Sequence, residues 1–360
     1  MKTIGIVTII DYYNYGNRLQ NYALSHLLKD RMRCRVLTLE GYSHSQIEDN
    51  FEDWCKEQLA LQLCRFPAFA HRHFKPSMIR WFNFAEWSRR WIPRKRFYSC
   101  NNLPENLNHQ FDLFLSGSDQ IWNYKIQNQR LDDYFLTFAE DKKKNSISAS
   151  FGVERIPESK QDYYRKNLAS FANISVREEV GARIVKGLIG RECPVLIDPV
   201  FMLSQKEWIN VENKPNVDTA TPYILKYFLG NSNDLIDSWA NAQGYAIYDL
   251  MDKHNSKLYS SGPGEFISLI RNASLICSDS FHCIAFAIIF SKPFIVYERQ
   301  GSENYMGSRI ESLLKKFNFE NRMDNVLKPD DYLQCSFQYV KTRMEEEQNS
   351  FMDYLGTIIR

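Results

Sequence analysis

Leu275-Ile276-Cys277-Ser278-Asp279-Ser280-Phe281-His282 is the stretch that most clearly indicates the fold class. Residues 273–277 form an apolar run typical of a buried strand, and three polar residues end it. Residues 281–289 then follow the pattern of a small apolar helix, so His282 is expected where a strand ends and a helix begins. In open α/β sheets ligands bind at this junction, because the helix N–H groups favour an anion such as phosphate.

The same alternation of strand and helix patterns extends over most of the chain. Expected strands cover residues 4–10, 34–39, 111–116, 145–151, 195–197, 222–229, 245–250 and 293–297. This order is typical of parallel sheets joined by right-handed crossovers. We therefore predict an α/β protein with two Rossmann-like domains that face each other across a cleft and contain mostly parallel sheets.

A chain of 360 residues is too long for one ordinary core, so two domains are expected. We assign residues 1–170 to an N-terminal domain, residues 171–335 to a C-terminal domain, and residues 336–360 to a helix that returns to the first domain. Residues 42–99 are expected to form a helical insertion rich in aromatic and basic side chains. Its basic residues are Arg65, His71, Arg72, His73, Arg80, Arg89, Arg90, Arg94, Lys95 and Arg96.

This insertion leaves two interpretations open. It is either a solvated helical segment whose aromatic side chains pack on the first domain, or a patch for an anionic acceptor or a peripheral membrane contact. The whole chain has a formal net charge of only +2, with no sign of a nucleic-acid-binding protein.

The eight cysteines and the N-terminus indicate a cytoplasmic protein. No two cysteines have C-x-x-C spacing, so we expect reduced thiols and no zinc site. Residues 4–10 are apolar but end at Asp11 without a cleavage site, which favours a first strand over a signal peptide. No stretch reaches the roughly 18 apolar residues of a membrane span.

Two side chains in the second half are candidates for anion chemistry. His282 either holds a phosphate and passes a proton, or is a hydrogen-bonded core histidine. Arg177 follows an expected strand, and its guanidinium either grips a carboxylate or phosphate or forms a salt bridge with Glu178 or Glu179.

Candidates in the first half follow two other expected strands. Gly16 and Asn17 precede the first helix, where a glycine allows close approach of a ligand. Asp119 either accepts a proton from a hydroxyl or caps a helix. P-loop, H-E-x-x-H, G-x-S-x-G and EF-hand motifs are absent from the sequence, and we expect no metal.

Taken together, several of these stretches resemble the polysaccharide pyruvyl transferase family. The matching segments, in chain order, are residues 9–24 (IIDYYNYGNRLQNYAL), 117–123 (GSDQIWN), 175–178 (SVRE), 196–199 (LIDP), 278–282 (SDSFH) and 292–294 (KPF). They span nearly all of the chain, apart from residues 42–99, and their common order makes the resemblance specific.

The resemblance implies a GT-B-like enzyme that takes phosphoenolpyruvate as co-substrate, with no further cofactor. It places the three carbons as a cyclic ketal across two hydroxyls of a sugar and releases phosphate, as in exopolysaccharide or capsule biosynthesis. The implied catalytic residues are His282 and Arg177, and the implied donor-binding residues are these two with Ser280 and Phe281. The implied acceptor-binding residues are Asp11, Asn14, Asn17, Arg18 and Asp119, for a sugar or glycan that is free or lipid-linked.

One departure from the family pattern is Cys283, because a glycine commonly follows the histidine there. A thiol at this position could narrow the site. Two other functions stay open: a glycosyltransferase of the same build that uses a nucleotide sugar, and a carbohydrate-binding protein without catalytic activity.

Overall fold

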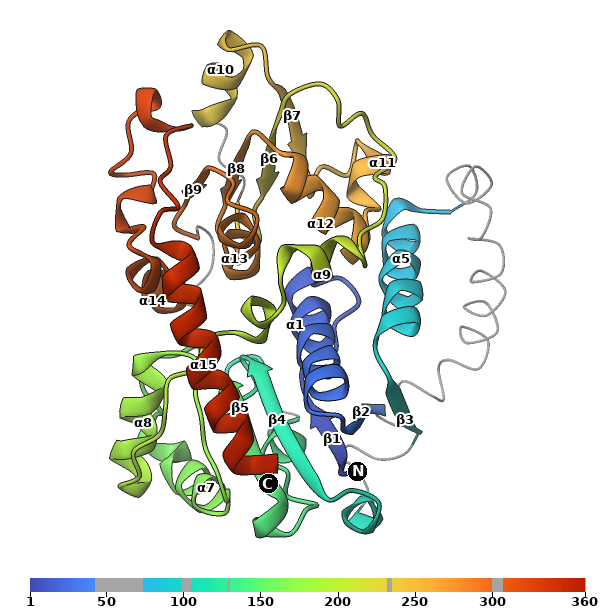
Figure 1. Cartoon of the computed structure of the whole chain (residues 1–360), viewed down its shortest axis with the longest axis vertical. Helices are drawn as coiled ribbons and strands as arrows, with labels where there is room; N and C mark the ends of the chain where they lie inside the picture. The colour runs from blue at the N-terminus through green and yellow to red at the C-terminus, as the bar shows by residue number, and fades with distance from the viewer. Residues whose placement is uncertain (43–73, 99–104, 128–129, 232–234, 300–306, 360) are drawn as a thin grey trace.

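The predicted class, two parallel-sheet α/β domains, is confirmed by the computed structural model, which describes residues 1–42, 74–98, 105–127, 130–231, 235–299 and 307–359 (Figure 1). The first sheet has the order β3-β2-β1-β4-β5, and the second the order β7-β6-β8-β9. Every pairing within both sheets is parallel. The strands are β1 (Thr3–Val7), β2 (Arg35–Tyr42), β3 (Arg94–Tyr98), β4 (Leu113–Asp119), β5 (Lys144–Ala149), β6 (Tyr223–Tyr227), β7 (Ala246–Asp249), β8 (Leu275–Ser278) and β9 (Phe294–Val296).

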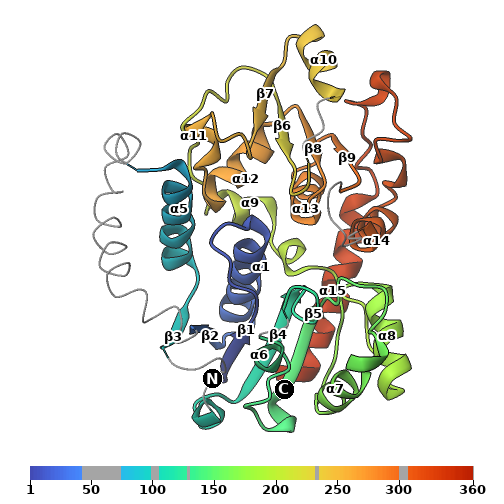
Figure 2. The ribbon, with the colours of Figure 1, turned by 180° about the vertical axis from the view of Figure 1, so that it is seen from behind.

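Helices connect these strands and cover the two sheets, as the views from the front and from behind show (Figures 1 and 2). The α-helices are α1 (Tyr15–His26), α5 (Pro76–Trp91), α6 (Leu131–Tyr134), α7 (Glu158–Ala169), α8 (Glu179–Ile189), α9 (Gln205–Ile209), α10 (Leu235–Ala242), α11 (Ser256–Tyr259), α12 (Pro263–Asn272), α13 (Phe281–Ile289), α14 (Gly307–Phe317) and α15 (Val340–Ile359). One π-helical turn, Leu27–Arg31, follows α1. None of the helices among the described residues is both long and apolar enough to cross a bilayer.

The strand that opened the sequence analysis, β8, is buried along its whole length. It lies between β6 and β9, and Ile276 is in register with Leu225 on one side and Phe294 on the other. A parallel strand covered on both faces needs a continuous apolar run, which explains why the pattern did not alternate. The polar residues that end the run place His282 in the first turn of α13.

The boundary between the domains differs from the predicted one at residue 171. Isolated parallel bridges connect Asn145 with Asn173, Ala149 with Val176, and Val176 with Val195. Bridges at Asn173, Val176 and Val195 therefore extend the first sheet beyond β5, although the predicted boundary places these residues in the second domain. The physical reason is apolar burial, because Val176 belongs to the same core cluster as Trp122.

The expected insertion at residues 42–99 is only partly described, and residues 43–73 lie outside the described residues. Helix α5 is helical as predicted, but Arg94–Tyr98 form strand β3 beside β2, which corrects the expected helix there. Arg94 Nη1 donates to the Tyr12 hydroxyl at 2.5 Å, and Lys95 Nζ donates to Gln110 at 2.5 Å. These two basic side chains are therefore engaged within the first domain.

Helix α1 joins the two domains through an aromatic contact. The Tyr15 ring stacks on Phe266 of α12 with centroids 4.2 Å apart, and its hydroxyl donates to the Ser261 carbonyl at 2.8 Å. Apolar residues of α1, α12 and α13 belong to one continuous buried cluster. The relative position of the two sheets is therefore fixed by core packing.

The last helix, α15, runs from the second domain down along the first (Figure 1). Near its end the Tyr354 hydroxyl donates to the Ser146 carbonyl of β5 at 2.9 Å. Phe351 and Leu355 on the same helix are completely buried. The C-terminal helix thus contacts the first sheet, in the place where we expected it to return.

A buried arginine on α5 forms a second connection between the domains. Arg80 Nη1 donates to the carbonyls of Tyr259 at 2.9 Å and Leu250 at 3.3 Å, both in the second domain. Its Nη2 donates to the Tyr13 carbonyl at 3.3 Å, and its guanidinium lies over the Tyr15 ring at 4.7 Å. One buried guanidinium therefore satisfies three backbone carbonyls and packs on the face of the Tyr15 ring.

We expect Arg80→Met to lower the free energy of unfolding by about 3 kcal/mol, because it leaves buried carbonyls without their charged donor. The measurement is urea denaturation followed by circular dichroism. The matched control is Arg89→Met on the same helix, where an exposed pair with Glu86 should contribute less than about 1 kcal/mol. Equal effects of the two variants would contradict the assigned role of Arg80.

Candidate functional site

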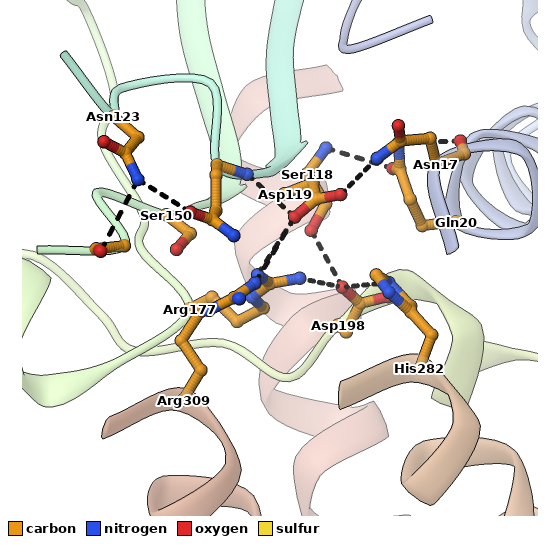
Figure 3. A network of polar contacts seen from close by, with 12 residues as sticks. Asn17, Gln20, Ser118, Asp119, Asn123, Ser150, Arg177, Asp198, His282 and Arg309 are labelled. Carbon is orange, nitrogen blue, oxygen red and sulfur yellow. Dashed lines mark hydrogen bonds and ion pairs between the residues drawn. The ribbon is translucent and has the colours of Figure 1, made fainter. Parts of the chain in front are cut away.

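The candidate site lies where polar ends of the first sheet meet the start of α13 (Figure 3). Asp119 is the last residue of β4, and Arg177 and Asp198 follow residues that bridge to the edge of the same sheet. His282 reaches this group from the second domain. Because the carboxyl ends of parallel strands share one edge, three segments far apart in sequence converge there.

Asp198 connects most of the group. Its Oδ2 accepts from Arg177 Nη1 at 2.6 Å and from Ser118 Oγ at 3.1 Å, and lies 3.5 Å from His282 Nε2. Its Oδ1 accepts from the Val200 backbone N–H at 3.1 Å, which caps the short 3₁₀ turn Pro199–Met202. The turn at Asp198-Pro199 therefore holds a carboxylate against both sequence-predicted catalytic residues.

The structure brings Arg177 and His282 together, as both contact the same carboxylate oxygen. Arg177 also approaches Asp119 Oδ1 through Nη2 at 3.3 Å, and its guanidinium lies 4.5 Å from the centre of the Phe281 ring. The sequence analysis considered Glu178 as the salt-bridge partner of Arg177, and Glu178 does lie 3.9 Å away. It did not foresee the two nearer carboxylates, Asp198 and Asp119.

The His282 ring packs against the start of α1. A Cβ atom added at Gly16 would lie 1.9 Å from His282 Nδ1, so only a glycine fits at this position. Asn14 caps α1 by accepting from the Asn17 backbone N–H at 3.3 Å. The space at Gly16 that we expected a ligand to approach is therefore occupied by the His282 side chain of the second domain.

Asp119 lies between two arginines and an amide. Its Oδ1 is 3.3 Å from Arg177 Nη2 and 3.6 Å from Arg309 Nη1, and its Oδ2 accepts from Asn17 Nδ2. Arg309 comes from α14 and is 6% exposed. Sequence analysis did not single out Arg309, because the sequence around it carries no recognisable motif.

The charges in this buried group set one another's ionisation. Burial disfavours the charged form of Asp119, but Arg177, His282 and Arg309 outweigh it and lower the pKa of this carboxyl. For Asp198, His282 and Arg177 likewise outweigh burial and lower the pKa. The pKa of Arg177 is raised, because Asp119 and Asp198 more than offset its burial.

Other sequence-predicted residues lie beside this group or have separate contacts. Ser280 caps α13 by position, and the Phe281 ring contacts both Arg177 and His282. Asp11 accepts from the Tyr13 backbone N–H at 2.8 Å, while Arg18 is completely buried and donates to the Ile9 carbonyl at 2.9 Å. The charged group therefore unites Asn17 and Asp119 of the predicted acceptor residues with His282 and Arg177.

Cys283 does not narrow the site. Its side chain is completely buried in the apolar core cluster, and burial raises the pKa of the thiol to about 12. It therefore packs in the core, whereas the neighbouring His282 lies 3.5 Å from Asp198. The described cysteines, Cys34, Cys193, Cys277, Cys283 and Cys335, are all free.

A comparison with protein families assigns most of the chain to one of them. The model of the polysaccharide pyruvyl transferases matches residues 14–301, which include every member of the charged group except Arg309. The chain belongs to the polysaccharide pyruvyl transferase family. No curated protein matches it in a sequence search.

Solved structures of similar overall shape include the UDP-GlcNAc 2-epimerases of Neisseria meningitidis and Methanocaldococcus jannaschii. The first has a TM-score of 0.46 and 12% identity, over 98% of this chain and 94% of that chain. The second has a TM-score of 0.48 and 11% identity, over 98% of this chain and 100% of that chain. An Anabaena protein in complex with UDP and glucose has a TM-score of 0.47 and 10% identity, over 99% of this chain and 100% of that chain.

A glycine-to-alanine substitution tests the packing of His282 against the start of α1. Alanine normally stabilises a helix relative to glycine, but at Gly16 its Cβ would collide with His282. We expect Gly16→Ala to lower the free energy of unfolding by about 1–3 kcal/mol. The control is Gly187→Ala in α8, where nothing lies within 4 Å and a small stabilisation is expected. A stabilising Gly16→Ala would refute the predicted collision.

The pH dependence of stability tests the carboxylate of Asp198. Its lowered pKa means that its stabilising contribution is fully present above the pKa of an unfolded aspartate, about 3.9, and is lost as the pH falls further. We expect Asp198→Asn to lose about 3–5 kcal/mol of unfolding free energy at pH 7, because Arg177 loses its nearest partner.

The difference between wild type and Asp198→Asn should stay constant from about pH 5 to 7 and shrink below about pH 4. Asp162→Asn is the control, since that exposed carboxylate pairs only at the surface. Chemical denaturation at each pH measures all three proteins. A difference that grows as the pH falls would overturn the assignment.

Proposed function

We propose that the protein transfers the pyruvyl group of phosphoenolpyruvate to two hydroxyls of a sugar in a glycan or its precursor. The product is a cyclic ketal, and phosphate is released. Membership of the polysaccharide pyruvyl transferase family supports the transferase class. The observation that carries the proposal is the contact of Arg177 and His282 with one carboxylate oxygen at the domain junction.

The reaction balances with the residues present. Two C–O bonds form at C2 of phosphoenolpyruvate and the C–O bond to phosphate breaks. Of the two hydroxyl protons, one ends on the methylene carbon and the other on phosphate. His282 would protonate the leaving phosphate, a contribution of about 10²–10⁴-fold to the rate, while Arg177 would hold the anion in line.

The ionisation of Asp119 argues for a positioning role in this scheme. A carboxyl with a lowered pKa is a weak base at neutral pH, so it is poorly suited to remove a proton from a sugar hydroxyl. As a permanent anion it can hold Arg177 and Asn17 in place. Asp119 would thus orient the donor-binding cation on one side and an acceptor-facing amide on the other.

The acceptor would be bound from the first domain. Asp11, Asn14 and Asn17 lie in or next to the loop between β1 and α1, and their oxygens and amides suit sugar hydroxyls. The proposal includes a free or lipid-linked acceptor of a capsule or exopolysaccharide pathway in the cytoplasm, where phosphoenolpyruvate is the co-substrate. Arg18 would support the loop through the Ile9 carbonyl.

The test is incubation with phosphoenolpyruvate and a panel of hexosides, with phosphate release and the mass of the sugar both measured. We expect phosphate release with a matching mass gain, and a loss of about 100-fold or more in His282→Ala. The matched control is His254→Ala, which removes an exposed histidine of the same domain. Release of a nucleoside diphosphate from a sugar nucleotide instead would support a glycosyltransferase and refute the proposal.

A further inference from the structure

Charges of alternating sign form a chain across the domain junction (Figure 3). The order is His282, Asp198, Arg177, Asp119 and Arg309, and successive closest approaches are 3.5, 2.6, 3.3 and 3.6 Å. All five residues are at least nine-tenths buried. The arrangement therefore has a histidine at one end and an arginine at the other, separated by an aspartate-arginine-aspartate centre.

The two domains contribute different parts of this chain. The centre belongs to the first domain, since Asp119 ends β4 and the other two residues follow its edge bridges. The two end residues, His282 and Arg309, come from α13 and α14 of the second domain. A small ligand at the junction would therefore meet a second-domain side chain with N–H donors at each end.

Arg309 is held in place by the end of β4. With its amide oxygen turned toward α14, Gln120 accepts from Arg309 Nη2 at 2.7 Å and from Nη1 at 2.9 Å. Burial and the neighbouring Arg177 lower the pKa of Arg309 to about 10. A buried guanidinium beside another cation is unfavourable unless anions compensate both.

A carboxylate already shows how an anion fits between the two guanidiniums. Asp119 Oδ1 lies within 3.6 Å of an Nη atom of each arginine. Arginines bind carboxylates and phosphates through paired N–H donors, and two of them around one anion form a selective site. Arg177 stands next to His282, so Arg309 marks the end of the chain farther from the proposed phosphate-protonating group.

We propose that Arg309 is a donor-binding residue that recognises the carboxylate of a small substrate carrying both a phosphate and a carboxylate. This rests on the proposed function. The phosphate would lie toward His282 and Arg177, and the carboxylate would lie toward Arg177 and Arg309. Arg309 would thereby favour a ligand with both anionic groups over phosphate alone.

Binding of two probes, measured by calorimetry, tests this without requiring turnover. The probes are 2-phosphoglycolate, which carries a phosphate and a carboxylate, and inorganic phosphate. We expect Arg309→Met to weaken 2-phosphoglycolate about 10- to 100-fold, the size of a lost charged hydrogen bond, and inorganic phosphate less than about 3-fold. The matched control is Lys316→Met on the same helix, whose cation pairs with Glu347 away from the site.

Each outcome decides the inference. Equal weakening of both probes would mean that Arg309 only braces Asp119 and Gln120, and unchanged binding would mean that it takes no part; either result overturns the proposal. If Arg309→Met does not fold, Arg309→Lys is the alternative variant, because it keeps the positive charge but lacks the paired N–H donors of the guanidinium. It should reduce the preference for 2-phosphoglycolate over phosphate. A wild type that shows this preference but never releases phosphate from phosphoenolpyruvate would refute the proposed function alone.

Discussion

Neutralisation of the buried Arg177 guanidinium is the constraint on which the junction of the two domains depends. A cation removed from water is strongly unfavourable unless carboxylates lie within contact distance. Asp198 at 2.6 Å and Asp119 at 3.3 Å supply that compensation, and both come from the same edge of the first sheet. The second domain then adds His282 to a group whose internal charges are already arranged.

This arrangement explains why the surrounding elements are packed so closely. The glycine at position 16 lets the first turn of α1 meet the His282 ring, and Tyr15 beside it joins α1 to α12. On the other side of α1, Arg80 links α5 to carbonyls of the second domain. The geometry of the charged group is thus set by core contacts on two flanks, which favours a preorganised site.

A preorganised group of paired charges also has consequences for substrate binding. Neighbouring groups lower the pKa values of both aspartates, so the aspartates stay ionised at neutral pH. As fixed anions they keep the arginines oriented. A substrate that carries anionic groups would therefore meet arginines whose positions are already set by these aspartates.

The sequence by itself determined much of the fold and part of the site. Apolar runs ended by polar residues located β8, β4 and β6, because a strand buried on both faces needs continuous apolar side chains. The same endings located His282 and Asp119, whereas the turn residues placed the first helix after Asn17 and α1 begins at Tyr15. These features are local, and a short window of sequence contains the physical cause of each.

Only the tertiary structure decided which of these ends meet. Asn173 and Val176 bridge to the first sheet because Val176 packs in its core, and no local pattern distinguishes this from packing in the second domain. Asp198 and Arg309 became partners of Arg177 and Asp119 through contacts that span 21 and 190 positions of sequence. The first pair depends on how two chain segments meet at the edge of the first sheet, and the second on how the two domains dock.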